Sequence, residues 1–150
     1  MGKRKLEIDA ARATALAAEL HAVGGKLKRR LREQASAGDL TPSQTSVLMH
    51  LDREGPTTVT TLARTEGVRS QSMGATVAVL EAAGLVAGLP DPKDGRQTIL
   101  SLTPACRELI RSGRAARHDW LFRAIQAKLT PQEQDQLAAA MSLLNRLVDT

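Results

Sequence analysis

The sequence predicts a mainly helical protein with one small β-hairpin, and three observations lead to this prediction. The 150 residues are 42% hydrophobic and 25% charged but only 1% aromatic, which fits a mainly helical domain with an aliphatic interior. Long segments space their apolar residues three and four positions apart, as amphipathic helices do. The stretch LPDPKDGRQT (89–98) is rich in turn-forming residues and lies between short runs of β-formers. The length favours one domain over residues 1–150.

The first predicted helix spans residues 9–35. Its apolar stripe is formed by Leu16, Leu20, Val23, Leu27 and Leu31. Gly24 and Gly25 weaken this helix by about 1 kcal/mol each relative to alanine. They indicate a kink, a close approach by another backbone, or a tolerated weakness, and the sequence leaves these three alternatives open.

Three Thr-Pro pairs mark further helix starts. Thr41 suits an N-cap, Pro42 the first helical position and Gln44 the reciprocal partner of a capping box. Val47, Leu48 and Leu51 supply the inward face of this second helix. The same signature recurs in TPQE (130–133), and Thr103-Pro104 begins one more helix, so the last third of the chain should form two helices, 104–128 and 131–148.

The terminal helices each carry an apolar stripe that they cannot bury alone. Residues 104–128 and 131–148 share this need with the first helix, although that helix is distant in sequence. We therefore expect the termini to pack together and against a second copy of the chain. A bundle formed within one chain is the alternative.

The middle of the chain, 57–86, has the pattern of two helices joined by a tight turn. A short helix with Val59 and Leu62 leads to a turn at Gly67, and a second helix runs from about Arg69 to Ala83. Met73, Val77 and Leu80 form the inward face of the second helix, so its first two turns should project these residues outward: Ser70, Gln71, Ser72 and Ala75. This arrangement is typical of a helix-turn-helix motif.

A charged hairpin follows this motif directly. AGLVAGL runs into one short strand and TILSL (98–102) forms the next, so Lys93 and Arg96 should lie at the tip between them. A recognition helix followed by a hairpin is a winged helix. Its wing can reach the minor groove, where the strongly negative potential attracts cations.

These segments resemble the MarR family, the multiple antibiotic resistance regulators. The resemblance covers about residues 41–112. It is carried by LARTEGVRSQSMGATVAVLEAAGLV, by the wing DPKDGR (91–96) and by the exit Leu102-Thr103-Pro104. It implies a winged-helix DNA-binding core at 41–102, dimerisation helices at 9–35 and 104–148, and a homodimer that straddles a pseudo-palindromic operator on double-stranded DNA. It also implies a repressor released by a small-molecule effector, whose binding residues the sequence does not identify.

Site residues follow from the motif and from the resemblance. The expected DNA contacts are Arg69, Ser70, Gln71, Ser72, Ala75, Lys93 and Arg96. The resemblance implies that Arg96 enters the minor groove and that Asp91 orients it. Lys93 and Ala75 depart from the family pattern, in which arginine and a basic residue are frequent at these positions. We therefore expect Gln71 to contact adenine, with further specificity from DNA shape.

Net charge and the remaining residues limit other functions. A formal charge of +5 and a pI near 10 fit an anionic partner, and no signal peptide or membrane span is visible, so we expect a cytoplasmic protein. The three histidines are scattered, which argues against a metal site, and no catalytic constellation or cofactor motif is present, so we expect no enzyme.

Two alternatives to the DNA-binding regulator remain. One is a winged helix used for protein contact, which would need an exposed apolar patch. The other is a redox-responsive regulator that uses the lone cysteine, Cys106, although a small packing residue is the favoured interpretation of that position.

Overall fold

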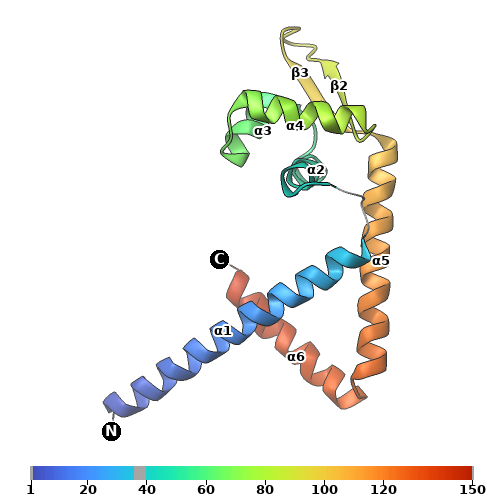
Figure 1. The fold of residues 1–150 in the computed structure, drawn as a ribbon. Coiled ribbons are helices and arrows are strands. Elements are labelled where there is room, and N and C mark those ends of the chain that lie inside the picture. Colours follow the sequence, from blue (N-terminus) through green and yellow to red (C-terminus); the bar gives the residue numbers. More distant parts are fainter. Residues whose placement is uncertain (1, 36–39, 150) are drawn as a thin grey trace. The chain divides into compact units, whose positions relative to one another are not determined.

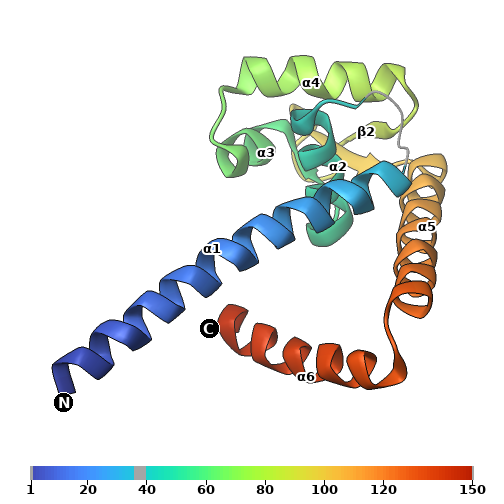
Figure 2. The same cartoon turned by 60° about the horizontal axis from the view of Figure 1, so that its bottom comes forward.

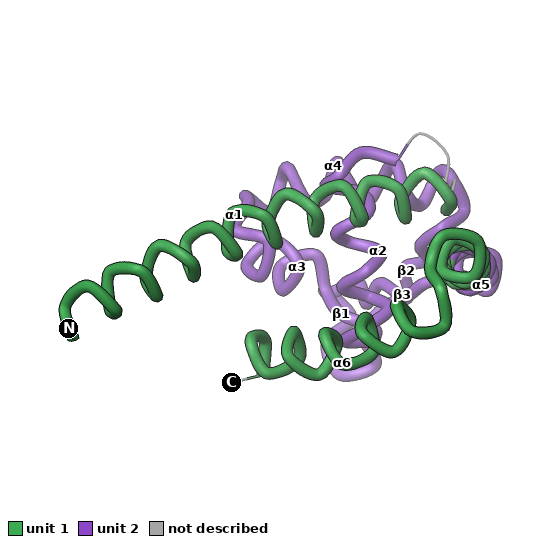
Figure 3. Tube along the Cα trace, turned by 90° about the horizontal axis from the view of Figure 1, so that it is seen from below, with its two compact units in different colours: residues 1–36, 114–150 green, residues 37–113 purple. Residues whose placement is uncertain are grey.

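The computed structural model describes residues 2–35 and 40–149, and these form two compact units (Figure 3). One unit comprises residues 37–113 and the other comprises residues 1–36 with 114–150. The predicted break between the first two helices, SAGDL, falls mostly on residues 36–39, outside the described residues.

The unit formed by residues 37–113 is a small helical domain with a three-stranded antiparallel sheet (Figure 1). Its elements are α2 (Pro42–Glu54), β1 (Thr57–Thr58), α3 (Val59–Glu66), α4 (Ser70–Ala82), β2 (Val86–Pro90), β3 (Thr98–Leu102) and the start of α5 (Pro104–Lys128). The strand order is β1-β3-β2, so the hairpin strand β3 is central. The predicted fold class, mainly α with a β-hairpin wing, is confirmed.

Strand β1 was not predicted from the sequence. Thr57 pairs with Leu100 and Thr58 with Ile99, which ties the start of α3 to the hairpin. A strand of two residues has no alternation of apolar and polar side chains, and its partner is about forty positions away in sequence. No local pattern could therefore reveal it.

The core of this unit is aliphatic and is shared by its helices and its sheet. The buried residues are Val47, Leu48, Leu51, Leu62, Ala63, Met73, Val77, Leu80, Val86, Leu100, Leu102 and Cys106. The inward faces predicted for the second helix of the chain and for the second helix of the helix-turn-helix pair are all in this set. One further residue is buried among them, His50, and it is polar.

The other unit contains α1 (Gly2–Gln34), α6 (Pro131–Val148) and the part of α5 from residue 114 onward. Helix α1 begins seven residues before the predicted start and continues through Gly24 and Gly25. A Cβ added at either glycine would meet no described atom within 4 Å. Within the described chain, no other backbone therefore packs closely against these glycines. No described residue of this unit is buried.

Local capping explains where two of the helices begin. Thr41 accepts the N–H of Gln44 at 3.2 Å and the Gln44 side chain accepts the N–H of Thr41 at 3.1 Å. Thr130 and Glu133 form the same reciprocal pair at the start of α6. Both predicted capping boxes are confirmed, as are the predicted bounds of the last two helices.

Candidate nucleic-acid interface

The turn between α3 and α4 has the geometry of a helix-turn-helix (Figures 1 and 2). Gly67 ends α3 in the left-handed region at φ 67°, a conformation that glycine adopts without steric cost. Val68 then donates its N–H to the carbonyl of Ala63 at 3.0 Å. Arg69 takes up an extended conformation, and its carbonyl accepts the N–H of Met73 at 3.0 Å, the first hydrogen bond of α4.

Helix α4 separates a buried face from an exposed one. Met73, Val77 and Leu80 are buried in the core. The predicted DNA-contacting residues of this element are all exposed: Arg69, Ser70, Gln71, Ser72 and Ala75. The first turn of α4 has no acidic residue, so the partial positive charge at the helix N-terminus is not offset there. The geometry therefore presents small polar groups and an anion-attracting helix end on one surface.

The wing tip is closed by backbone hydrogen bonds. Strands β2 and β3 pair in register from Val86 with Leu102 to Pro90 with Thr98. Beyond the last pair, the N–H of Asp91 donates to the carbonyl of Gln97 at 2.8 Å, and the N–H of Gln97 donates to the carbonyl of Asp94 at 3.0 Å. The loop that carries the two cations is therefore a folded turn.

Two aspartates hold the backbone of this turn. The carboxylate of Asp91 accepts the N–H of Lys93 at 2.9 Å, and the carboxylate of Asp94 accepts the N–H of Arg96 at 3.1 Å. Asp91 thus acts on the wing through Lys93, while the carboxylate that contacts Arg96 belongs to Asp94, which sequence reasoning missed. The signal was present, since each aspartate lies two positions before a cation, the spacing of an Asx-turn.

Both wing cations are available to an external partner. Lys93 and Arg96 are exposed, and within the described chain neither makes a salt bridge to a carboxylate. Their charges are therefore not neutralised internally. The wing and the exposed face of α4 both belong to the unit of residues 37–113, so their relative placement is part of one compact body.

The described residues do not form a metal site, a His–Asp dyad or a membrane-spanning helix. Among the described residues no three His, Cys, Asp or Glu side chains cluster as metal ligands would. Asp119 pairs with Arg123 and not with its neighbour His118, and this hydrogen bond from Arg123 lowers the pKa of the Asp119 carboxyl. No described helix combines the length and the apolar character that crossing a bilayer requires.

Cys106 is enclosed in the core at 1% exposure. Burial raises the pKa of its thiol, which lowers the fraction of reactive thiolate. Both observations favour the packing interpretation of this residue over a redox sensor.

Comparison with known proteins agrees with this geometry. A family model described as MarR family matches residues 38–97. An uncharacterized HTH-type transcriptional regulator of Mycobacterium bovis is 37% identical over 134 residues, which cover 89% of this chain and 93% of that protein.

Among solved structures, a putative transcriptional regulator of Pseudomonas aeruginosa has 38% identity and a TM-score of 0.79, with 93% of this chain and 97% of that chain covered. The Staphylococcus aureus MepR F27L mutant, solved bound to an oligodeoxyribonucleotide, shares the fold with a TM-score of 0.71 at 16% identity, over 89% of this chain and 98% of that one. The chain belongs to the MarR family of winged-helix transcriptional regulators, which bind DNA and are not enzymes.

Proposed function

We propose that this protein is a homodimeric, sequence-specific repressor that binds a pseudo-palindromic operator and is released by a small-molecule effector. The observation that carries the DNA-binding part is the exposed N-terminal half of α4 beside an exposed wing with two unneutralised cations. A structural neighbour, the MepR mutant, was solved with an oligodeoxyribonucleotide, which supports nucleic acid as the partner. Repression and release by an effector rest on the family resemblance.

In the proposed complex α4 lies in the major groove. The carboxamide of Gln71 pairs with adenine, the hydroxyls of Ser70 and Ser72 contact base edges or phosphates, and the methyl group of Ala75 contacts thymine. Arg69 adds a phosphate contact at the helix start. Because none of these side chains forms the bidentate arginine pair that reads guanine best, direct readout favours A·T pairs.

The wing supplies the second contact. Arg96 enters the adjacent minor groove, and Lys93 approaches the phosphates as a point charge. The hydrogen bond from the N–H of Arg96 to Asp94 fixes the backbone from which the guanidinium extends. Wing binding therefore depends on groove width, which makes specificity partly a matter of DNA shape.

The unit of residues 1–36 and 114–150 supports the proposed homodimer. Leu16 and Leu20 are 60% and 43% exposed, and large apolar side chains on α6 are exposed as well. Exposed apolar side chains along these helices are unfavourable for a monomer in water. The same apolar side chains on a second copy of the chain provide a self-complementary partner. We assign α1, α6 and the part of α5 from residue 114 to the dimer interface.

The DNA-binding proposal is tested by replacing Arg96 with alanine. Selection from a random duplex pool first identifies the operator, and binding is then measured by gel shift at several salt concentrations. We expect the variant to bind more weakly and the salt slope to fall by about 1, because one phosphate-region cation is lost. Arg111→Ala is the matched control, since Arg111 is equally cationic but pairs with Glu108 on α5, outside the wing, α4 and the proposed dimer interface.

If wild-type protein binds no duplex even at low salt, the proposal is overturned in favour of a winged helix for protein contact. If Arg96→Ala leaves both affinity and slope unchanged, the wing assignment is wrong. Gln71→Ala should relax preference at one or two base pairs in each half-site, and a uniform loss across all sequences would contradict direct readout.

The dimer is tested by light scattering after chromatography. Leu16→Glu combined with Leu20→Glu places two charges in the proposed interface and should convert the dimer to monomer. Leu89→Glu is the control, because Leu89 is at least as exposed but lies on the wing strand β2. A wild-type protein that is monomeric at micromolar concentration would exclude the homodimer.

A further inference from the structure

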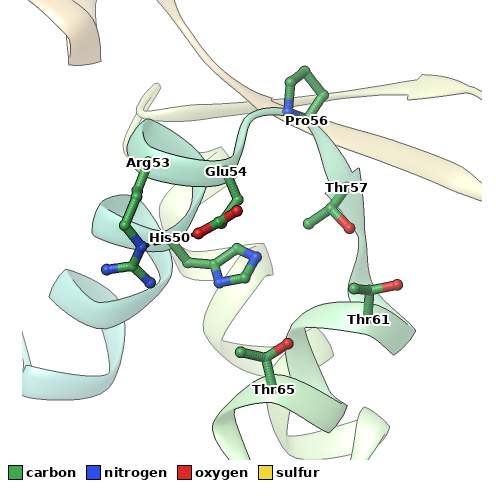
Figure 4. A pocket seen from close by; sticks show the side chains of 7 residues that line it. All are labelled: His50, Arg53, Glu54, Pro56, Thr57, Thr61 and Thr65. Carbon is green, nitrogen blue, oxygen red and sulfur yellow. Dashed lines mark hydrogen bonds and ion pairs between the residues drawn. The ribbon is translucent and has the colours of Figure 1, made fainter. Parts of the chain in front are cut away.

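A pocket of about 420 Å³ lies within the winged-helix unit, between the end of α2 and α3 (Figure 4). His50, Arg53 and Glu54 line it from α2, and Thr57, Thr61 and Thr65 line it from the opposite side, with Pro56 between them. The pocket has the size of an ordinary small-molecule site. None of these residues is among those assigned above to DNA contact.

His50 has no partner for one of its polar atoms. The residue is 7% exposed, and its Nδ1 atom is buried without a hydrogen-bond partner in the described chain. An unpaired buried polar atom is costly, and an apolar side chain at this position would not carry that cost. The ring also lines the pocket, so His50 presents a polar edge to a molecule bound there.

The charged groups of the pocket are of both signs and are near its mouth. Arg53 donates from Nε to Glu54 Oε1 at 3.1 Å, and their side chains are 68% and 58% exposed. This contact uses one of the five donors of the guanidinium and leaves its terminal nitrogens available. Figure 4 shows the Glu54 carboxylate and the His50 ring extending into the space faced by the threonines, with Arg53 at the rim.

The threonines complete a neutral, hydrogen-bonding wall. Thr61 and Thr65 are four residues apart on α3 and so lie on one side of it, while Thr57 lines the pocket from β1. The hydroxyls of Thr57 and Thr65 can donate and accept, whereas that of Thr61 already accepts the Thr58 hydroxyl at 3.1 Å and can still donate. The threonine methyl groups, together with the ring of Pro56, offer a small apolar surface. The pocket therefore combines a carboxylate, a guanidinium, neutral donors and acceptors, and a limited apolar wall.

We propose that this pocket binds a small zwitterion of the free amino-acid class. The ammonium group of the ligand faces Glu54, His50 and the threonine hydroxyls, the carboxylate faces the terminal nitrogens of Arg53, and an aliphatic side chain covers Pro56 and the threonine methyl groups. A ligand with no net charge matches a lining in which one cation and one anion already balance. A simple anion would be repelled by Glu54, and a simple cation by Arg53.

Occupancy of the pocket has a direct route to α4. A bound molecule bridges α2 and α3, and Leu62 and Ala63 of α3 pack in the same core as Met73 and Val77 of α4. If α4 reads DNA as proposed above, the ligand acts as an effector of DNA binding. This last step rests on the proposed function, whereas binding to the pocket does not.

The test compares three probes on one carbon skeleton by calorimetry and by NMR of the His50 imidazole. Leucine carries both charges, 4-methylpentanoate lacks the ammonium group, and 3-methylbutylamine lacks the carboxylate. We expect leucine to bind saturably with a dissociation constant at least about ten-fold lower than either half-ligand, and to shift the His50 resonances. Equal binding of a half-ligand, or no saturable binding of leucine, would overturn the proposal.

Variants locate the binding in this pocket. Glu54→Gln and Arg53→Gln should each weaken leucine binding about ten-fold or more. Glu108→Gln is the matched control, because it breaks a comparably exposed Arg–Glu pair with Arg111 on α5, outside the pocket, and should leave the affinity unchanged. Equal loss in the control, or no loss in both pocket variants, would place the ligand elsewhere.

A DNA arm separates this inference from the proposed function. Leucine should change the operator affinity of the wild type and not of Glu54→Gln. Operator binding without any leucine binding would overturn the pocket alone. Leucine binding without a change in operator affinity would overturn the effector role, and leucine binding by a protein that ignores DNA would overturn the proposed function alone.

Discussion

Thr103 donates its hydroxyl to the carbonyl of Gly84 at 2.7 Å and so joins the end of α4 to the start of α5. Gly84 has φ 74°, a left-handed conformation that turns the chain from α4 into β2. The same Thr103 oxygen accepts the N–H of Cys106 at 3.1 Å, and the N–H of Thr103 donates to the carbonyl of Leu85 at 3.1 Å. One threonine therefore fixes the base of the wing against two helices.

Replacing Thr103 with valine should destabilise the winged-helix unit. Valine keeps the shape but leaves the Gly84 carbonyl and the Cys106 N–H without this partner, a loss of roughly 1–3 kcal/mol in the free energy of unfolding. Urea denaturation measures it. Thr60→Val is the control, because Thr60 is exposed on α3, and a loss of equal size there would show that the hydroxyl of Thr103 is not the cause.

Gly88 should not tolerate alanine. A methyl group added at its Cα would lie 2.7 Å from Thr98 Cγ2 and 3.2 Å from Glu81 Oε1. Threonine is stiff because it is branched at Cβ, so the strands must shift, at a cost of roughly 1–3 kcal/mol in the free energy of unfolding.

A double-mutant cycle gives the sharpest form of this prediction. Thr98→Ala removes the clashing methyl group and should restore much of the stability lost in Gly88→Ala. Gly95→Ala is the control at the wing tip, where an added methyl group meets nothing within 4 Å. Strictly additive effects of the changes at positions 88 and 98 would contradict the clash.

Asp94 should act on DNA binding through geometry and not through its charge. Asparagine retains an oxygen that accepts the N–H of Arg96, whereas alanine does not. We expect Asp94→Ala to weaken operator binding about five-fold, the equivalent of one hydrogen bond, and Asp94→Asn to bind at least as well as the wild type, because a negative charge near the phosphates is removed. Fluorescence anisotropy distinguishes these outcomes. Equal weakening by both changes would show that the charge itself is needed.

The sequence predicted those features that short stretches of chain determine. Met73, Val77 and Leu80 follow from helical periodicity, and Thr41 and Thr130 follow from capping chemistry that is complete within four residues. The exposure of Gln71 then follows from the helix geometry alone.

Features that depend on distant contacts were not predictable. The pairing of β1 requires Leu100, and the burial of His50 depends on how α2, β1 and α3 pack. In the sequence His50 is one of three scattered histidines, and only the fold distinguishes it. The hydrogen bond from the backbone N–H of Arg96 to Asp94 could have been predicted from the sequence, because the two-residue spacing is that of an Asx-turn.

Cys106 should make stability depend on pH at the alkaline end. Burial raises the pKa of its thiol above the ordinary value of about 8.5 that the unfolded chain has. A group whose folded pKa is raised contributes stability that is present in full below the unfolded pKa, and this contribution is lost as the pH rises through the folded pKa. The wild type should therefore lose stability above about pH 8.5, and Cys106→Ala should lose less over the same interval even though it starts from a lower value because of the cavity.

In the folded protein at neutral pH the thiol should react with a disulfide reagent only as fast as the core opens, and its reaction in urea provides the reference rate. Rapid modification of the folded protein, together with a change in operator affinity, would restore the redox-responsive alternative.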